Sequence, residues 1–298
     1  MTAPSLTSIV VVAADSGAGL VDAARRALAS SVPVELIISD NASSDGSVAA
    51  VEAQFGADPR VRIVHNGKNL GFGAGVNRVA AQARGDHLLI LNPDCLLDTD
   101  TVERLLAQAA AVPRLGLLGA RIRHPDGSDE AASRRRDPTL RRSLMTLSGL
   151  ARFAADRPAW QGVNEPLDEA VRGADGPAEA VSGALMLLPR AAFDAVGGFD
   201  EGYFLHCEDL DLCRRLRDAG YAVHYAGSIA VVHGKGGSSR HRPVFVAWHK
   251  HRGMWRWFRR FDPAAHRPLL SGLVWLGLWA RFAASLPLLL WRKRRRAR

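Results

Sequence analysis

The chain has 298 residues, of which 47% are hydrophobic and 23% are charged. This is the composition of a globular protein, and it excludes a disordered or collagen-like chain. The length suits one large α/β domain or two small ones. The net charge of +9 is distributed unevenly along the chain. Residues 235–298 hold 16 Lys and Arg against a single acid, Asp262, so residues 1–234 carry a net charge of −6. We therefore expect an acidic globular body and a basic C-terminal element that meets an anionic surface.

The first 120 residues alternate between strand and helix signals. Short apolar runs predict strands over Ser8–Ala13, Val34–Ser39, Val61–Val64, His87–Leu91 and Leu115–Ala120. The segments between them predict helices over Leu20–Ala29, Ser47–Phe55, Val76–Ala83 and Thr101–Ala110. This alternation indicates βαβ crossovers and a largely parallel sheet, whose ligands bind at the carboxyl ends of the strands.

Residues 121–180 lose this alternation and are rich in Arg, Pro, Gly and Asp. A long irregular stretch inside a compact domain is usually functional or mobile. Regular signals return as a strand over Ala180–Leu188, a helical turn over Ala191–Val196, a helix over 208–219 and strands near Ala222–Tyr225 and Ile229–His233.

Three carboxylates, Glu208, Asp209 and Asp211, open the helix expected at 208–219. Helical spacing places Asp209 along the apolar stripe, whereas Glu208 and Asp211 are expected to face outward, with Asp211 paired to Arg215 one turn on. A buried carboxylate is costly unless it is needed there, and a helix N-terminus would keep it ionised, as a general base must be. The alternative is N-terminal capping and surface charge.

A polar motif, Asp40-Asn-Ala-Ser-Ser-Asp-Gly46, follows the second expected strand. Asp40 could accept a hydrogen bond from the imide N–H of a pyrimidine base, while Ser43, Ser44 and Gly46 open the next helix. An ordinary N-cap and turn is the alternative.

The stretch Asn69-Leu-Gly-Phe-Gly-Ala-Gly-Val-Asn77 is a glycine-rich helix start. It lacks the dinucleotide-binding pattern G-x-G-x-x-G, because position 76 is Val76. Its exposed backbone amides could still meet a phosphate or a ribose.

Asp94, in Asn92-Pro-Asp94, follows the fourth expected strand and is suited to ligate a hard divalent cation that holds a diphosphate. His233 ends the last expected strand and could complete such a site, with Lys235 on phosphate oxygens. A strand-ending turn and a locally hydrogen-bonded histidine are the alternatives.

Beyond Arg242 aromatic and basic residues interleave, and an apolar run over Leu269–Trp291 ends in the basic cluster Arg292–Arg296. This pattern could indicate nucleic-acid binding, but no recognition fold accompanies it, so we expect no nucleic-acid partner. The run is long enough to span a membrane, but Arg281 near its centre costs about 2.5–3.5 kcal/mol and Pro287 interrupts it. An interfacial element, with Trp and Leu in the acyl boundary and the basic cluster on anionic lipid, fits better.

In this order the motifs resemble the family 2 inverting glycosyltransferases of GT-A fold, particularly bacterial rhamnosyltransferase-like members. The matching segments span roughly residues 8–240 and comprise Asp40-Asn-Ala-Ser-Ser-Asp-Gly, Asn69-Leu-Gly-Phe, Leu91-Asn-Pro-Asp, Val181-Ser-Gly-Ala, Val196-Gly-Gly-Phe-Asp-Glu, Glu208-Asp-Leu-Asp-Leu-Cys-Arg-Arg-Leu and Val232-His with Gly236-Gly-Ser-Ser. The resemblance implies an α/β GT-A fold with a mainly parallel central sheet flanked by helices. It implies a catalytic domain over 1–240, with 121–180 as an acceptor-side insertion, and a helical membrane-associating region over 241–298.

The resemblance also implies an activity: transfer of rhamnose or a similar hexose, with inversion, from a dTDP-, UDP- or GDP-sugar to a lipid-linked or polysaccharide acceptor of the cell envelope. Asp209 looks like the general base, and Asp94 and His233 look like ligands of Mg²⁺ or Mn²⁺, with Asn92 in the place of the first acid of a DxD motif. The remaining donor-side residues would be Asp40, Asn41, Ser43, Asp45, Asn69, Gly71, Phe72, Asn77, Asn92, Ser182, Gly183 and Lys235. On the acceptor side they would be Glu208, Gly198 and Phe199.

One departure concerns the first strand, which ends in Ala13-Ala-Asp15 where the family usually has Thr-Tyr-Asn or similar. The choice of nucleotide therefore stays open, and the sequence also leaves the oligomeric state open. A nucleotidyltransferase would show a basic glycine-rich signature that residues 15–19 lack. A non-catalytic sugar-nucleotide-binding or scaffold protein is the other alternative, and the joint presence of Asp94, Asp209 and His233 argues against it.

The three cysteines form no CxxC pair and fit a reducing cytosol. The N-terminal apolar run has only the length of a strand and lacks the layout of a signal peptide. We expect a cytoplasmic protein that associates peripherally with the inner face of the cell membrane.

Overall fold

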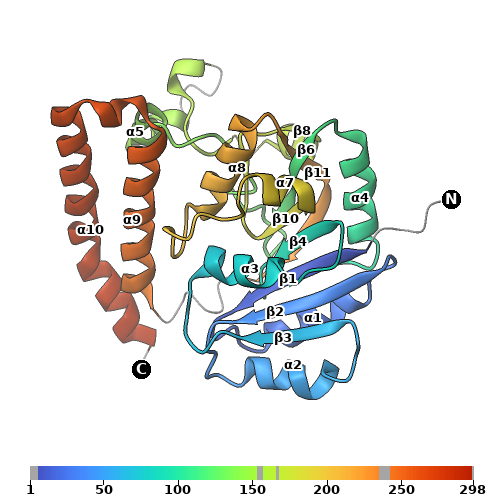
Figure 1. Ribbon diagram of the computed structural model, residues 1–298. Coiled ribbons are helices and arrows are strands. Elements are labelled where there is room, and N and C mark those ends of the chain that lie inside the picture. Colours follow the sequence, from blue (N-terminus) through green and yellow to red (C-terminus); the bar gives the residue numbers. More distant parts are fainter. Residues whose placement is uncertain (1–5, 153–156, 166–167, 235–241, 297–298) are drawn as a thin grey trace.

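The computed structural model describes residues 6–152, 157–165, 168–234 and 242–296. Its centre is a nine-stranded sheet in the order β3-β2-β1-β4-β10-β6-β11-β5, with β8 paired to β11 off this path (Figure 1). The strands are β1 (Thr7–Ala13), β2 (Val34–Asp40), β3 (Val61–His65), β4 (His87–Leu91), β5 (Cys95–Leu96), β6 (Leu115–Arg123), β8 (Gly176–Pro177), β10 (Leu185–Pro189) and β11 (Ala222–His233). A separate two-stranded sheet joins β7 (Arg134–Arg135) to β9 (Ala180–Val181).

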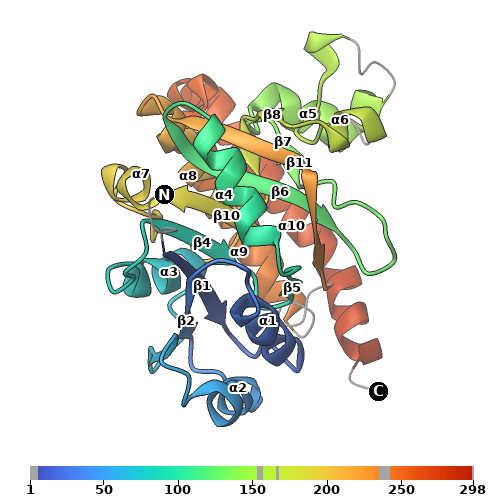
Figure 2. The same ribbon diagram turned by 90° about the vertical axis from the view of Figure 1, so that its right-hand side faces the viewer.

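Helices cover both faces of the sheet. They are α1 (Gly19–Leu28), α2 (Ser47–Phe55), α3 (Phe72–Ala80), α4 (Thr101–Ala111), α5 (Leu140–Ser148), α6 (Glu169–Gly173), α7 (Arg190–Ala195), α8 (Glu208–Asp218), α9 (Pro243–Phe261) and α10 (Pro268–Arg296). One buried cluster packs α1, α2 and α4 on one face, and a second packs α3, α7, α8 and α9 on the other. Figure 2 shows α1 and α4 in front of the sheet and the α9–α10 pair behind it.

The N-terminal half forms as the sequence predicts, because its strands are apolar and buried on both faces. All seven residues of β1 and all seven of β2 are buried. β3, β2, β1 and β4 run parallel, while β10 inserts antiparallel between β4 and β6, so the sheet as a whole is mixed.

Three predicted boundaries differ from the structure. α3 begins at Phe72 and not at Val76, because Gly71 turns the chain at φ +89° just before it. The single strand expected over Ala180–Leu188 is divided into β9 and β10. The two strands expected after α8 form the single strand β11, with a register shift against β6 between Ala226 and Ala230.

The C-terminal helices α9 and α10 form a hairpin along one side of the body (Figure 1). α9 is anchored in the core by Trp257 and Phe258, which are 3% and 6% exposed. α10 packs on α9 through Trp248, which contacts the rings of Trp279 and Phe282. Within the described residues, Pro268–Trp291 is the one stretch of helix long and apolar enough to cross a membrane, and the helix continues through Pro287.

A buried carboxylate joins the first two strands to the loop before β4. Glu35 of β2 is 1% exposed and accepts hydrogen bonds from Ser8 Oγ at 2.6 Å, Arg84 N at 2.6 Å and Arg84 Nε at 2.8 Å. Burial alone would raise the pKa of Glu35, but the hydrogen bonds from Ser8 and Arg84 and the Arg84 charge lower it below its usual value.

This lowered pKa predicts a pH-dependent contribution to stability. Because the folded pKa of Glu35 lies below the unfolded value of 4.5, the contribution is present above pH 4.5 and is lost as the pH falls through the folded pKa. We expect Glu35→Gln to lower the free energy of unfolding by about 1–3 kcal/mol at pH 7, and by less at pH 3.5. Urea unfolding followed by tryptophan fluorescence measures both, with the exposed Glu52→Gln as control. An equal loss at the two pH values would contradict this role.

Candidate active site

The carboxyl ends of β1, β2 and β4, the end of β11 and the N-terminus of α8 border a cleft of about 1610 Å³. The lining includes most of the site residues that the sequence singled out: Asn41, Asn69, Gly71, Phe72, Asn92, Asp94, Ser182, Gly183, Glu208, Asp209 and His233. The structure therefore brings together residues that are as far apart in the chain as positions 41 and 233.

Asp94 and His233 meet in this cleft. His233 Nε2 lies 3.0 Å from Asp94 Oδ1, and Asn92 Nδ2 lies 3.2 Å from the same nitrogen. The other ring nitrogen, Nδ1, lies 3.0 Å from Glu130 Oε2, and Ser182 donates to Glu130 Oε1 at 3.1 Å. Burial opposes the charge of His233, but the hydrogen bonds and charges of Asp94 and Glu130 outweigh burial and raise its pKa to about 9.

The donor set of this pair fits a divalent cation. A carboxylate oxygen and an imidazole nitrogen converge, and the second ring nitrogen is held by a carboxylate, which is how histidine ligands are usually oriented. Among the described residues there is no group of three or more His, Cys, Asp and Glu that could hold a metal, so these side chains would supply only two ligands. Glu130 lies in the stretch over 121–180 and carries no sequence signal that would have predicted its place here.

Asp209 is held from three directions. Its Oδ2 forms an ion pair with Arg135 and accepts a hydrogen bond from Gly183 N at 3.1 Å, while Oδ1 accepts one from Leu210 N at 2.8 Å. Its side chain is 13% exposed. Burial alone would raise the pKa of Asp209, but the Arg135 charge and these hydrogen bonds lower it below its usual value. The carboxylate is therefore ionised and faces the cleft.

Arg135 was not predicted as a site residue. It comes from β7, whose pairing with β9 places its guanidinium beside Asp209 and 2.7 Å from the carbonyl oxygen of Val181. The break in the expected strand at 182–184 also brings a group to Asp209, because it turns the backbone N–H of Gly183 toward this carboxylate. A Cβ on Gly183 would lie 3.3 Å from the Cβ of Asp209, so this close approach favours glycine.

The predicted outward orientation of Glu208 and Asp211 is wrong. Glu208 is 7% exposed and Asp211 is fully buried, because α9 and the loop before α8 cover the first turn of the helix. The predicted pair between Asp211 and Arg215 is present, and Arg260 of α9 adds a second ion pair to Asp211 at 3.0 Å.

Glu208 differs from its neighbours in having a free oxygen. Its Oε2 is buried and has no hydrogen-bond partner within the described part of the chain, although the residue lines the cleft. Burial, with the charge of Asp209 next, raises the pKa of Glu208 to about 8. The carboxyl group is therefore largely protonated at neutral pH and able to donate a hydrogen bond.

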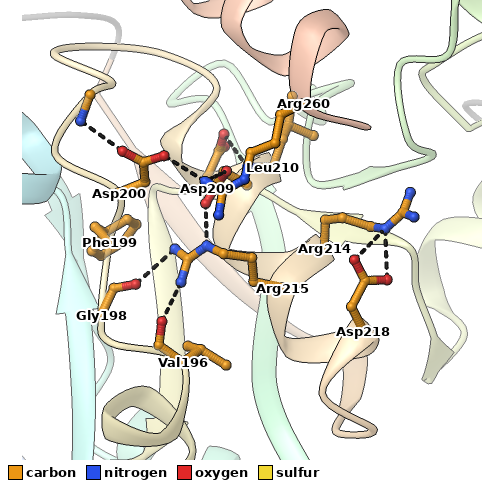
Figure 3. A network of polar contacts seen from close by, with 12 residues as sticks. Val196, Gly198, Phe199, Asp200, Asp209, Leu210, Arg214, Arg215, Asp218 and Arg260 are labelled. Atoms are coloured by element: carbon orange, nitrogen blue, oxygen red, sulfur yellow. Dashed lines mark hydrogen bonds and ion pairs between the residues drawn. The ribbon is translucent and has the colours of Figure 1, made fainter. Parts of the chain in front are cut away.

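A polar network holds the N-terminal part of α8 in place (Figure 3). Besides pairing with Asp211, Arg215 donates to the carbonyl oxygens of Val196 at 2.6 Å and Gly198 at 2.7 Å. Arg260 bridges Asp211 to Asp200, whose Oδ2 it meets at 2.5 Å. The loop before α8, α8 itself and α9 are thus joined around one buried carboxylate.

Several predicted donor-side and acceptor-side residues lie outside the lining of the cleft. Asp40 is 5% exposed, and its two oxygens already meet Ser43 N and His65 Nδ1, each at 2.8 Å. Ser43 Oγ accepts a hydrogen bond from Asp15 N at 3.2 Å. Asp45 accepts from Gly17 N at 2.7 Å.

These contacts tie the loop after β2 to the loop after β1. Because Ser43 Oγ accepts from Asp15 N and Asp45 accepts from Gly17 N, both side chains act between the two loops. Asn77 contacts the backbone of Phe199, donating to its carbonyl oxygen and accepting from its N–H, each at 2.9 Å. The carbonyl oxygen of Gly198 accepts a hydrogen bond from Arg215 at 2.7 Å. Lys235, the predicted phosphate contact, lies outside the described residues.

Comparison with known proteins identifies the family. The model of the family described as "Glycosyl transferase family 2" matches residues 8–161. The chain belongs to glycosyl transferase family 2. It is 33% identical over 254 residues to an N-acetylglucosaminyl-diphospho-decaprenol L-rhamnosyltransferase of Mycobacterium tuberculosis, a match that covers 77% of this chain and 79% of the relative. The glycosyltransferase is thus rhamnosyltransferase-like, as its motifs indicated.

Solved structures establish the fold of the glycosyltransferase as GT-A. A mannosyltransferase from Pyrobaculum calidifontis, in complex with GDP-Man and Mn²⁺, matches with a TM-score of 0.59 and 17% identity over 96% of this chain and 76% of that one. TarS of S. aureus, in complex with UDP-GlcNAc, matches with a TM-score of 0.55 and 13% identity over 93% of this chain and 80% of that one.

The network around Asp211 predicts a large loss of stability when Arg215 is removed. Arg215→Ala leaves a fully buried carboxylate with Arg260 alone and frees two carbonyl oxygens, so we expect the free energy of unfolding to fall by about 3 kcal/mol. Arg25→Ala, which removes an exposed pair with Asp22, is the control and should cost less than about 0.5 kcal/mol. Urea unfolding compares the two variants, and equal losses would show that the network does not stabilise the fold.

Proposed function

We propose that this glycosyltransferase moves a sugar, rhamnose or a similar hexose, from a nucleotide diphosphate sugar to a lipid-linked acceptor of the cell envelope, with inversion at the anomeric carbon. The observation that carries the proposal is the ionised carboxylate of Asp209, held by Arg135 in the same cleft as Asp94 and His233. The name of the mycobacterial relative supports both rhamnose as the sugar and a diphospho-polyprenol as the carrier of the acceptor.

The donor end of the cleft would hold a divalent cation. Asp94 and His233 would ligate Mg²⁺ or Mn²⁺, and Glu130 would orient His233 through its other ring nitrogen. When bound, the cation would neutralise the charge that grows on the departing diphosphate. The mannosyltransferase of the same fold, which holds GDP-Man together with Mn²⁺, supports this assignment.

Asp209 would act as the general base in a single displacement. It takes the proton of the acceptor hydroxyl while the oxygen of that hydroxyl bonds to the anomeric carbon, and the bond from that carbon to the nucleotide diphosphate breaks with its electron pair. Attack from the side opposite the leaving group inverts the configuration. A positioned general base of this kind contributes about 10²–10⁴-fold to the rate.

The other parts of the chain have proposed places around this reaction. Asn41, Asn69 and the backbone at Gly71 and Gly183 line the cleft and would contact a dTDP-, UDP- or GDP-sugar. Residues 1–240 would form the catalytic domain, with 121–180 on the acceptor side, where it supplies Arg135. Residues 241–298 would hold the enzyme at the inner face of the cell membrane, through the apolar surface of α10 and the basic cluster at its C-terminal end.

The role of Asp209 predicts a loss of transfer without a loss of donor binding. We expect Asp209→Asn to lower kcat by about 10²–10⁴-fold, because the amide cannot take the proton. Release of nucleotide diphosphate is measured with dTDP-, UDP- and GDP-sugars, Mg²⁺ or Mn²⁺ and a bacterial lipid extract, and calorimetry measures donor binding. EDTA should abolish release. The control is Asp218→Asn, an exposed carboxylate at the other end of α8. Unchanged transfer in Asp209→Asn would rule out this base.

Arg135 is a positioning residue, and its removal should alter the pH profile. Arg135→Met removes the charge that lowers the pKa of Asp209, so burial should raise that pKa. The acid limb of the pH dependence of kcat/KM should then move to higher pH, with part of the activity recovered at alkaline pH. Arg135→Lys, which keeps the charge, should move it less. If the limb stays in place while the rate falls equally at every pH, Arg135 does not act through the charge of Asp209.

A further inference from the structure

The cleft does not end at the catalytic carboxylates. From Asp209 and Glu208 it continues as a groove between α5, α9 and α10. Residues along this groove make up about half of the residues that line the cleft. The walls of this groove are apolar and include Leu144 and Leu147 of α5, Met254 of α9, and Leu273, Leu278 and Leu289 of α10. Hydrocarbon chains are the ligands that such a lining favours.

The groove opens onto an exposed apolar surface. On its rim Leu144 is 52% exposed, Leu147 is 51% and Leu273 is 65%. Outside the groove lining, α10 carries further exposed apolar side chains, among them Trp275, Leu276 and Leu288. A hydrocarbon chain in the groove could therefore pass directly into a bilayer that contacts this surface.

Two cations of the hairpin helices line this otherwise apolar groove, Lys250 of α9 and Arg281 of α10, and Arg242 lines the cleft just before α9 begins. The side chains of Lys250 and Arg281 are exposed, and neither has an ion-pair partner within the described part of the chain. The acids that line the cleft, Asp15, Asp94, Glu130, Glu208 and Asp209, belong to the catalytic end. The groove thus carries a positive charge that no acid of its own walls balances.

His251 lies beside the two cations. It is 8% exposed, its Nδ1 donates to the carbonyl oxygen of Ala247 at 2.7 Å, and its Nε2 has no hydrogen-bond partner among the described residues. Burial lowers the pKa of His251, and the charges of Arg281 and Lys250 lower it further against the effect of the Ala247 hydrogen bond. A buried polar atom on the groove wall therefore lacks a partner close to the charges of Lys250 and Arg281.

We propose that this groove binds the diphosphate and the first isoprenoid units of a polyprenyl-diphosphate-linked acceptor, with Lys250 and Arg281 contacting the diphosphate. The inference rests on the proposed function and adds the location of the acceptor's carrier. The chemistry of such an acceptor matches what lines the cleft: a hydroxyl for Asp209, a diphosphate for the two cations and a hydrocarbon chain for the apolar walls of α5 and α10. The position of Arg281, in the middle of an apolar helix, follows from the same arrangement.

The test compares two acceptors that carry the same sugar. One is N-acetylglucosamine linked through a diphosphate to a farnesyl chain, and the other is the octyl glycoside of N-acetylglucosamine, which lacks the diphosphate. We expect the double variant Lys250→Ala/Arg281→Ala to raise KM for the diphosphate-linked acceptor at least tenfold, with little change for the octyl glycoside and for the donor. Arg252→Ala, an exposed cation of α9 outside the groove, is the control.

A second variant tests the apolar wall. Leu144→Ser/Leu147→Ser changes two exposed side chains, so the fold should be kept, and thermal unfolding checks this. We expect this variant to reduce the preference for a farnesyl over a shorter geranyl carrier, while Lys250→Ala/Arg281→Ala leaves that preference in place. An unchanged chain-length preference would overturn the assignment of the hydrocarbon to this groove.

The outcomes separate this inference from the proposed function. If the unmodified enzyme transfers sugar to both acceptors but the double variant loses both equally or neither, the proposed function stands and the groove is not the diphosphate site. If the double variant loses transfer to both acceptors equally and also no longer binds phosphatidylglycerol vesicles, the two cations contact bulk lipid instead. If the unmodified enzyme transfers to no lipid-linked or sugar acceptor with any donor, the proposed function itself fails, and this inference with it.

Discussion

The site depends on the ion pair between Asp209 and Arg135. A carboxylate that is 13% exposed at the start of α8 would be costly without a compensating charge, and Arg135 supplies that charge from a segment 74 residues earlier in the chain. The pair needs β7 docked on β9 and α8 fixed against α9. Without either contact, the guanidinium of Arg135 or the carboxylate of Asp209 would be buried without its partner. The stretch over 121–180, α8 and the C-terminal hairpin are therefore joined by the ion pairs of Asp209 with Arg135 and of Asp211 with Arg260.

The same arrangement separates two chemical environments within one cleft. At the strand ends, acids and the Asp94–His233 pair suit a cation and a diphosphate, whereas the groove between α5, α9 and α10 is apolar with two unpaired cations. Asp209 lies where the two meet. A donor held at the strand ends and an acceptor approaching from the hairpin would thus meet beside this carboxylate.

The strands of the N-terminal half could be predicted because their apolar runs are buried on both faces, and the polar residues that follow β4 and β11 meet as the topology requires. The orientation of Glu208 and Asp211 could not be predicted, because α9 covers a helix face that periodicity assigns to solvent. Arg135 and Glu130 reach the site through β7–β9 pairing and long-range hydrogen bonds, which no local pattern records. Asp40 was expected to contact a nucleobase, yet its oxygens are engaged by Ser43 and His65.

The anomeric configuration of the product tests the central claim most directly. NMR of the product formed from one defined donor measures this configuration against that of the donor sugar. We predict the opposite configuration, because Asp209, as proposed, would act as a base in one displacement and would form no bond to the sugar. A product with the donor's configuration would contradict it, since retention requires a route other than direct attack by the activated acceptor.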